Sequence, residues 1–86
     1  MNISAAGPSP DLLLLTRPGC HLCDAARQVL DRISADLGIS WREQSIEGDA
    51  DLTSRFGEEI PVLLIDGIQR DFWQIDETRI RRLLGH

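Results

Sequence analysis

The chain has 86 residues, a length that suits one small domain. Hydrophobic residues make up 42% of it, a share typical of globular proteins, which argues against a disordered, collagen-like or coiled-coil chain. Nine basic and 14 acidic residues give a net charge of −5, and this acidic balance disfavours a nucleic-acid partner. Every basic residue is an arginine, so Schiff-base chemistry on a lysine is excluded.

The sequence contains no run of the ~18 apolar residues that a membrane-spanning helix needs, and no signal peptide is recognised at its N-terminus. We therefore expect a soluble, cytoplasmic protein that has no membrane partner and is a monomer. Two cysteines are too few for a disulfide scaffold or a four-cysteine zinc site. In the reducing cytoplasm, two cysteines close in the sequence indicate catalysis or metal binding rather than a structural cross-link.

Residues 1–10 are rich in small residues and proline, and they are predicted to form a flexible leader ahead of a single domain over residues 11–86. The apolar run from Leu12 to Thr16 predicts a buried strand. Apolar residues at spacings of three and four then predict a helix that ends at Gly38. The apolar face of this helix would consist of Leu22, Ala26, Val29, Leu30, Ile33 and Leu37.

A strand from Ser40 to Ile46 is predicted next, followed by a short helix that Asp49 or Asp51 begins and that ends near Gly57. Two strands then follow, a buried one from Val62 to Ile65 and another from Ile68 to Trp73. Asp66-Gly67 is typical of a two-residue hairpin turn between the last two strands. Asp76 is expected to cap a final helix whose Ile80, Leu83 and Leu84 face inward. The order βαβαββα predicts an α/β fold with a four-stranded mixed sheet flanked by helices.

The motif Cys20-His21-Leu22-Cys23 lies between the first predicted strand and the first turn of the helix that follows. Unpaired backbone N–H groups at a helix start favour a thiolate, and motifs of this type lower a thiol pKa from about 8.5 to roughly 3.5–7.5. Cys20, at the start of the helix, is therefore predicted to be an exposed nucleophile. Cys23, one turn further, would resolve a mixed disulfide formed on Cys20, and Arg17 could add a positive charge.

Other interpretations of these residues stay open. Free cysteines are often buried simply as small apolar side chains. Zinc takes four ligands, and the other soft candidates are His21, next to Cys20, and His86, the last residue. No bound metal or cofactor is expected. His21 could tune the thiolate when protonated or could face solvent, and Arg17 could be an ordinary solvated charge.

Ile60-Pro61 directly precedes the third predicted strand. A proline at the first position of a strand is tolerated without any further reason. The functional alternative is a cis peptide bond, which only about 5–6% of X–Pro bonds in folded proteins adopt.

Two segments together carry a resemblance to a known family. LLLLTRPGCHLCDAARQVL, followed by FGEEIPVLLIDG, resembles the glutaredoxin-like branch of the thioredoxin superfamily, in particular small bacterial proteins with a C-x-L-C site. The similarity covers about residues 11–85. The joint pattern is specific: a strand, a basic residue with Pro-x-Cys-x-x-Cys, a helix, and then Ile-Pro before a hairpin with an Asp-Gly turn.

The resemblance implies a thioredoxin-like fold, with Cys20 as the nucleophilic cysteine and Cys23 as the resolving one. Arg17 would match the basic residue that precedes the active site. Pro61 would match the cis-proline beside the thiols. Ile60 would then offer its backbone N–H and C=O groups to an extended substrate, as an added strand does.

One stretch departs from the family pattern. Glutaredoxins have a Gly-Gly pair before the last helix, followed by acidic residues that hold the amino end of glutathione. The corresponding residues here are Trp73 and Gln74, and then Asp76 and Glu77. Trp73 and Gln74 could fill the groove that glycines leave open, and Asp76 could be a helix cap instead of a substrate contact. The sequence therefore leaves glutathione binding open.

We predict a thiol–disulfide oxidoreductase that reduces protein disulfides or glutathione mixed disulfides. Glutathione or a reductase protein would then restore the dithiol. His21 and Leu22 would lie against the substrate and influence the reduction potential. Two alternatives remain: a non-catalytic module that binds an extended peptide beside Pro61, with Phe72 and Trp73 as apolar contacts, and a metal carrier.

Overall fold

The structure, a computed structural model, describes residues 9–85. Most of the predicted leader over residues 1–10, and also His86, lie outside the described residues. The elements follow one another as β1 (Leu12–Thr16), α1 (His21–Leu37), β2 (Trp41–Ser45), α2 (Ala50–Phe56), β3 (Val62–Ile65), β4 (Ile68–Phe72) and α3 (Glu77–Leu83). This βαβαββα order confirms the predicted fold class. Asp49, rather than Asp51, caps α2.

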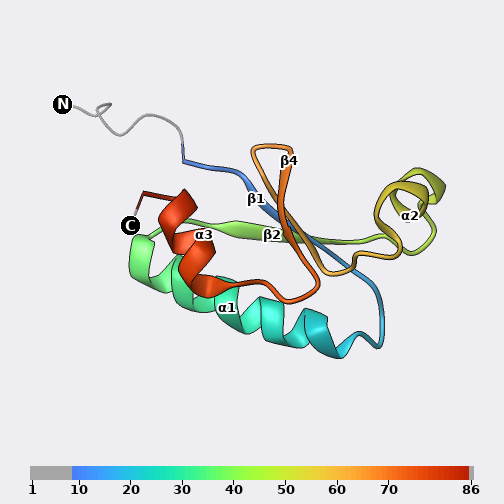
Figure 1. The fold of residues 1–86 in the computed structure, drawn as a ribbon, viewed down its shortest axis with the longest axis horizontal. Helices are drawn as coiled ribbons and strands as arrows, with labels where there is room; N and C mark the ends of the chain where they lie inside the picture. The colour runs from blue at the N-terminus through green and yellow to red at the C-terminus, as the bar shows by residue number, and fades with distance from the viewer. Residues whose placement is uncertain (1–8, 86) are drawn as a thin grey trace.

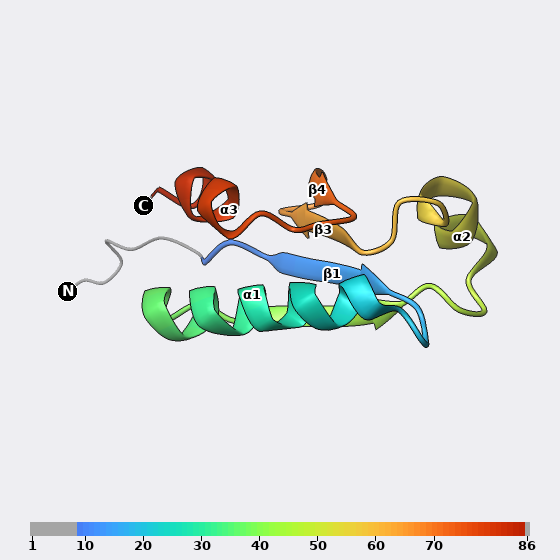
Figure 2. The same ribbon diagram turned by 60° about the horizontal axis from the view of Figure 1, so that its bottom comes forward.

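The four strands form one mixed sheet in the order β2-β1-β3-β4. β1 runs parallel to β2 because α1 carries the chain back between them, and β3 is antiparallel to both β1 and β4. Figures 1 and 2 show α1 and α3 against the sheet, and α2 at the end toward which β1 points. The end of β1, which leads into the cysteine motif, therefore lies on the side of the molecule that carries α2.

Asp66 and Gly67 join β3 to β4, and their φ angles are 53° and 81°. A positive φ at both central residues is the conformation of a type I′ turn, whose twist matches that of the paired strands. The Oδ1 atom of Asp66 also accepts a hydrogen bond from the backbone N–H of Asp11 at 2.9 Å. The predicted hairpin turn is thus confirmed, and it is tied to the start of β1.

The main core lies between one face of the sheet and the helices α1 and α3. Its buried members are Leu12, Leu14, Ala26, Leu30, Ile33, Leu63, Ile65, Ile75 and Ile80. The prediction was wrong for Leu22 and Leu83, which are 40% and 46% exposed. Leu22 lies in the first turn of α1 and Leu83 is the last residue of α3. Periodicity assigned both to an apolar face, but no neighbouring element covers those helix ends.

A second core cluster surrounds the end of β1 nearest α2. It consists of Leu15, Cys23, Ile46, Phe56, Ile60 and Val62. Phe56 is the buried residue of α2, and its ring joins that short helix to this cluster, with Leu52 packed beside it. Because this cluster contains Cys23, the cysteine motif lies directly at the edge of the packed interior.

Within residues 9–85, no helix has both the length and the apolar character needed to cross a membrane.

Candidate active site

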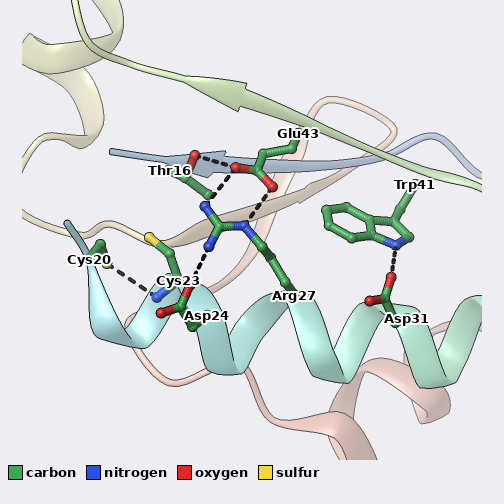
Figure 3. Close-up of polar contacts among 8 residues, drawn as sticks. All are labelled: Thr16, Cys20, Cys23, Asp24, Arg27, Asp31, Trp41 and Glu43. Carbon is green, nitrogen blue, oxygen red and sulfur yellow. Dashed lines mark hydrogen bonds and ion pairs between the residues drawn. The ribbon is translucent and has the colours of Figure 1, made fainter. Parts of the chain in front are cut away.

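Cys20 caps the N-terminus of α1 (Figure 3). Its backbone is extended, with φ −96° and ψ 113°, and its Sγ accepts a hydrogen bond from the backbone N–H of Cys23 at 3.2 Å. Gly19, directly before it, has a φ of 74°, a left-handed conformation that lets the chain turn from β1 into α1. The Cys20 sulfur thus lies at the positive end of a 17-residue helix, where backbone N–H groups lack partners within the helix.

Cys23 lies one turn inside α1 and is fully buried, whereas Cys20 is partly exposed. Burial is the main reason why the pKa of the Cys23 thiol rises from 9.0 to about 11, and its hydrogen bond with Cys20 also contributes. The backbone of Arg17 and the charge of Arg27 favour the thiolate and act in the opposite direction. An incoming disulfide can therefore reach Cys20 but not Cys23, as a nucleophile with a resolving partner requires.

The raised pKa of Cys23 predicts that the reduced protein loses stability in alkali. A thiol whose pKa is higher in the folded protein stabilises the fold below the unfolded value of 9.0, and this contribution disappears as the pH rises through 11. We expect the free energy of unfolding, measured by urea denaturation, to fall by about 2 kcal/mol across this window. The Cys23→Ser variant should lack this loss, and an equal loss in the variant would assign it to other groups.

Arg27 forms an ion-pair network beside Cys23 that the sequence analysis did not identify. Figure 3 shows its guanidinium reaching back along α1 toward the cysteines and toward β2. Its Nε and one terminal nitrogen donate to the carboxylate of Glu43, both at 2.8 Å, and its other terminal nitrogen donates to Asp24 at 2.6 Å. Thr16, buried at the end of β1, donates its hydroxyl to Glu43 at 2.9 Å.

The network holds Glu43 as a carboxylate, because its hydrogen bonds with Arg27 lower its pKa. One signal for this network was present in the sequence. Arg27 follows Cys23 by four residues, a spacing that places two side chains on the same face of a helix. No comparable signal exists for Glu43, which comes to this place because β2 pairs with β1 and Glu43 lies opposite Leu14.

Arg17 and His21, two other predicted site residues, are exposed. Arg17 acts on the buried thiol through its backbone, which favours the Cys23 thiolate and so lowers the pKa of Cys23. Its side chain lines a small cavity of about 250 Å³ together with Pro18, Ile46, Glu47 and Thr53. His21 is the first residue of α1 and is open to solvent. The structure therefore brings the backbone of Arg17 to the cysteine pair, whereas the side chains of Arg17 and His21 are exposed to solvent.

An open groove of about 630 Å³ adjoins the cysteine motif and the Ile60–Pro61 peptide bond. That bond is cis, and both of its residues are buried. The residues that line the groove include Leu22, Ile60, Phe72, Trp73, Gln74 and Arg79. Leu22, which the sequence placed in the core, thus forms part of the groove wall, and it is through Leu22 and Ile60 that the groove meets the cysteine motif and the cis bond.

Trp73 lines the groove, and 53% of the residue is exposed. Its φ is 59°, a left-handed conformation that is uncommon for a residue with a side chain. The indole N–H donates to the backbone carbonyl of Glu58 at 2.9 Å, and the ring meets that of Phe72 edge to face at 5.0 Å between centroids. Trp73 therefore stands in the groove and does not belong to the core.

Asp76 caps α3, since its Oδ1 accepts a hydrogen bond from the backbone N–H of Arg79 at 3.1 Å. The backbone N–H of Asp76 in turn donates to Asp71 at 2.9 Å. The helix-cap role considered for Asp76 is thus present, and its role as a substrate contact remains a prediction.

In the part of the chain that the structure describes, no three His, Cys, Asp or Glu side chains converge to hold a metal ion.

Comparison with known proteins adds to this geometry. The chain matches the family model described as "Glutaredoxin-like domain (DUF836)" over residues 11–85. An uncharacterized protein of Mycobacterium tuberculosis is 34% identical over 77 residues, which cover 84% of this chain and 79% of that protein. A solved structure of a protein from X. campestris is 36% identical, has a TM-score of 0.70, and matches over 85% of this chain and 93% of its own.

More distant structures show the same fold. The solution structure of protein Ne2328 from Nitrosomonas europaea has a TM-score of 0.83 at 23% identity and covers 99% of this chain and 100% of its own. A mutant thioredoxin from Halobacterium salinarum has a TM-score of 0.68 at 18% identity, over 93% of this chain and 75% of that one. The family model spans nearly the whole chain, and the fold is that of thioredoxins, so this chain belongs to the glutaredoxin-like family (DUF836) and has a thioredoxin-like fold.

Proposed function

We propose that this protein is a thiol–disulfide oxidoreductase in which Cys20 is the nucleophile and Cys23 the resolving thiol. The observation that carries the proposal is the contact at the start of α1, where the backbone N–H of Cys23 donates to the Cys20 sulfur at 3.2 Å. Backbone N–H groups and the helix dipole favour negative charge on that sulfur. Membership in the glutaredoxin-like family and the thioredoxin-like fold support redox chemistry of this kind.

The reaction has two exchange steps. In the first, the Cys20 thiolate attacks one sulfur of the substrate disulfide, and the other substrate sulfur leaves as a thiolate that takes up a proton. In the second, Cys23 loses its proton and attacks the Cys20 sulfur, and the bond from Cys20 to the substrate breaks. The substrate leaves with two thiols, and a disulfide joins Cys20 to Cys23. Glutathione or a reductase protein then returns two electrons and restores the dithiol.

The groove beside Leu22 and Trp73 is where the substrate would lie. Within residues 9–85, neither the backbone N–H nor the C=O of Ile60 has a backbone hydrogen-bond partner, although the residue is only 7% exposed. Unpaired backbone groups are costly when they are buried, so an extended substrate segment that pairs with Ile60 would satisfy them. Leu22 and Trp73 would then contact the apolar side chains of that segment.

Protein disulfides fit this groove better than glutathione mixed disulfides. Leu22, Phe72 and Trp73 are 40%, 39% and 53% exposed, so the groove presents apolar surface to its ligand. A protein segment can cover that surface with apolar side chains, whereas glutathione carries none of comparable size. Trp73 and Gln74 also stand where glutaredoxins have two glycines. We therefore place protein disulfides first among the substrates.

The Cys23→Ser variant provides the test, because it removes the second exchange step and retains the first. We expect the variant to accumulate a mixed disulfide with a disulfide-containing peptide, detected by mass spectrometry of the intact protein. The wild type should instead show a reversible dithiol–disulfide couple between about −120 and −300 mV. If neither appears, the oxidoreductase proposal is wrong and a non-catalytic peptide-binding module takes its place. Stoichiometric zinc in the purified protein would instead favour the metal carrier.

A further inference from the structure

The network of Arg27, Glu43 and Thr16 has no part in the two exchange steps described above, yet it lies directly beside the resolving thiol. Arg27 is one helical turn beyond Cys23, and Figure 3 shows its guanidinium turned back toward the cysteines. Two hydrogen bonds of 2.8 Å to Glu43 hold the guanidinium in one orientation, and Glu43 is itself held by the hydroxyl of Thr16. Such a bidentate contact fixes a charge in direction as well as in place.

The surroundings of Cys23 explain why a fixed charge matters there. The elements packed against its side chain otherwise contribute apolar groups, namely Leu15, Ile46, Phe56, Ile60 and Val62. The ionisable or charged groups that act on the thiol are Cys20 and Arg27, together with the backbone of Arg17. Behind Arg27 lie the carboxylates of Glu43 and Asp24, which are paired with it and offset part of its charge. A fully buried thiol must lose its proton before it can attack, and burial disfavours the charged form. Arg27 is the one cation among these groups whose charge bears on that step.

We infer that Arg27 is a positioning residue for the resolving step, in which its guanidinium, held by Glu43, stabilises the Cys23 thiolate as it forms. The Cys23 proton is lost to solvent, the thiolate attacks the Cys20 sulfur, and the departing substrate sulfur takes up a proton. Arg27 touches neither the substrate nor the sulfur that is attacked. The inference rests on the proposed function, since it concerns the second of the two exchange steps.

The electrostatic role makes a prediction that a purely structural role does not. Glu43 orients Arg27 but also offsets its charge, so the two side chains affect the Cys23 thiolate with opposite sign. Arg27→Met removes the cation and keeps the length of the side chain, and it should slow the resolving step. Glu43→Gln keeps a hydrogen-bonding group and removes the anion, and it should accelerate that step. Asp24 remains bonded to Arg27 in this variant and retains the guanidinium near Cys23.

The experiment uses one equivalent of the symmetrical disulfide of thionitrobenzoate and follows the coloured thiol by stopped flow. Attack by Cys20 releases the first thionitrobenzoate, and resolution by Cys23 releases the second. A tenfold change in thiolate fraction alters the rate only about threefold, because nucleophilicity falls with pKa. We therefore expect the second release at pH 7 to be roughly threefold slower in Arg27→Met and about twofold faster in Glu43→Gln. The pH profiles should move in opposite directions, to higher and to lower pH.

Two further variants serve as controls. Arg27→Lys keeps the charge without the bidentate contact and should restore most of the rate. Arg42→Met removes another arginine that forms a bidentate pair, with Asp11, and should leave the second release unchanged. If both Arg27→Met and Glu43→Gln slow the second release, or neither changes it, the inference is overturned while the proposed function stands. If the first release is absent in the wild type, the proposed function is wrong and the inference falls with it.

Discussion

Cys20→Ser is expected to abolish disulfide reduction, with a fall in kcat/KM of at least about a thousandfold. A serine hydroxyl stays protonated at neutral pH and cannot form a disulfide, so the first exchange step is lost. The fold should be unaffected, because Cys20 caps α1 and serine is among the residues that helices prefer at this position. The variant thus separates the chemistry of the sulfur from its structural role.

The measurement compares reduction of insulin with reduction of a glutathionylated small thiol. We expect the wild type to reduce insulin faster than the glutathionylated thiol, because a protein segment can cover the apolar surface of the groove. Cys20→Ser should reduce neither substrate. Gln28→Ala, on the exposed side of α1, is the matched control and should keep wild-type activity on both substrates. Activity of Cys20→Ser within tenfold of the wild type would exclude Cys20 as the nucleophile.

Leu30→Ala is expected to lower the free energy of unfolding by about 3 kcal/mol. Leu30 is fully buried between α1 and the sheet, where it belongs to the main core cluster. Its truncation removes apolar contacts and leaves a cavity that packed neighbours fill only in part. For a domain of this size, whose total stability is on the order of 5 kcal/mol, such a loss would leave the fold marginal.

Leu83→Ala makes the same chemical change at the end of α3, where the residue is 46% exposed. We expect it to cost less than about 1 kcal/mol, since little apolar surface is uncovered and no cavity forms. Urea denaturation of both variants gives the comparison. Equal losses for Leu30→Ala and Leu83→Ala would mean that Leu83 is buried in the core, as its helical spacing predicts.

The order of elements was readable from the sequence because each element carries a local signal. The run from Leu12 to Leu15 is apolar throughout, as a strand covered on both faces requires. Asp66-Gly67 specifies its turn through the backbone conformations that these two residue types tolerate. Cys20 and Cys23 could be assigned to a helix start because strand, turn residues and helix follow one another within a dozen positions of the chain.

The errors have a common physical reason. Leu22 and Leu83 satisfy the helical spacing of the apolar face, but spacing does not tell where the sheet or a neighbouring helix ends. Each residue lies in a terminal turn that nothing covers, and Leu22 consequently becomes part of the groove. The exposure of Leu22 made the core prediction wrong, and it also places this apolar side chain next to the expected substrate.

The sequence by itself determined the fold class, the βαβαββα order and the identity of the two cysteines, because these depend on residues that are neighbours along the chain. Only the tertiary structure decided what surrounds those cysteines. Arg27 and Glu43 are 16 positions apart and meet because β2 lies parallel to β1, which α1 covers. Leu22, Ile60 and Trp73 likewise come from three separate segments that line one groove. Contacts of this kind arise from strand pairing and packing, and no local pattern of residues encodes them.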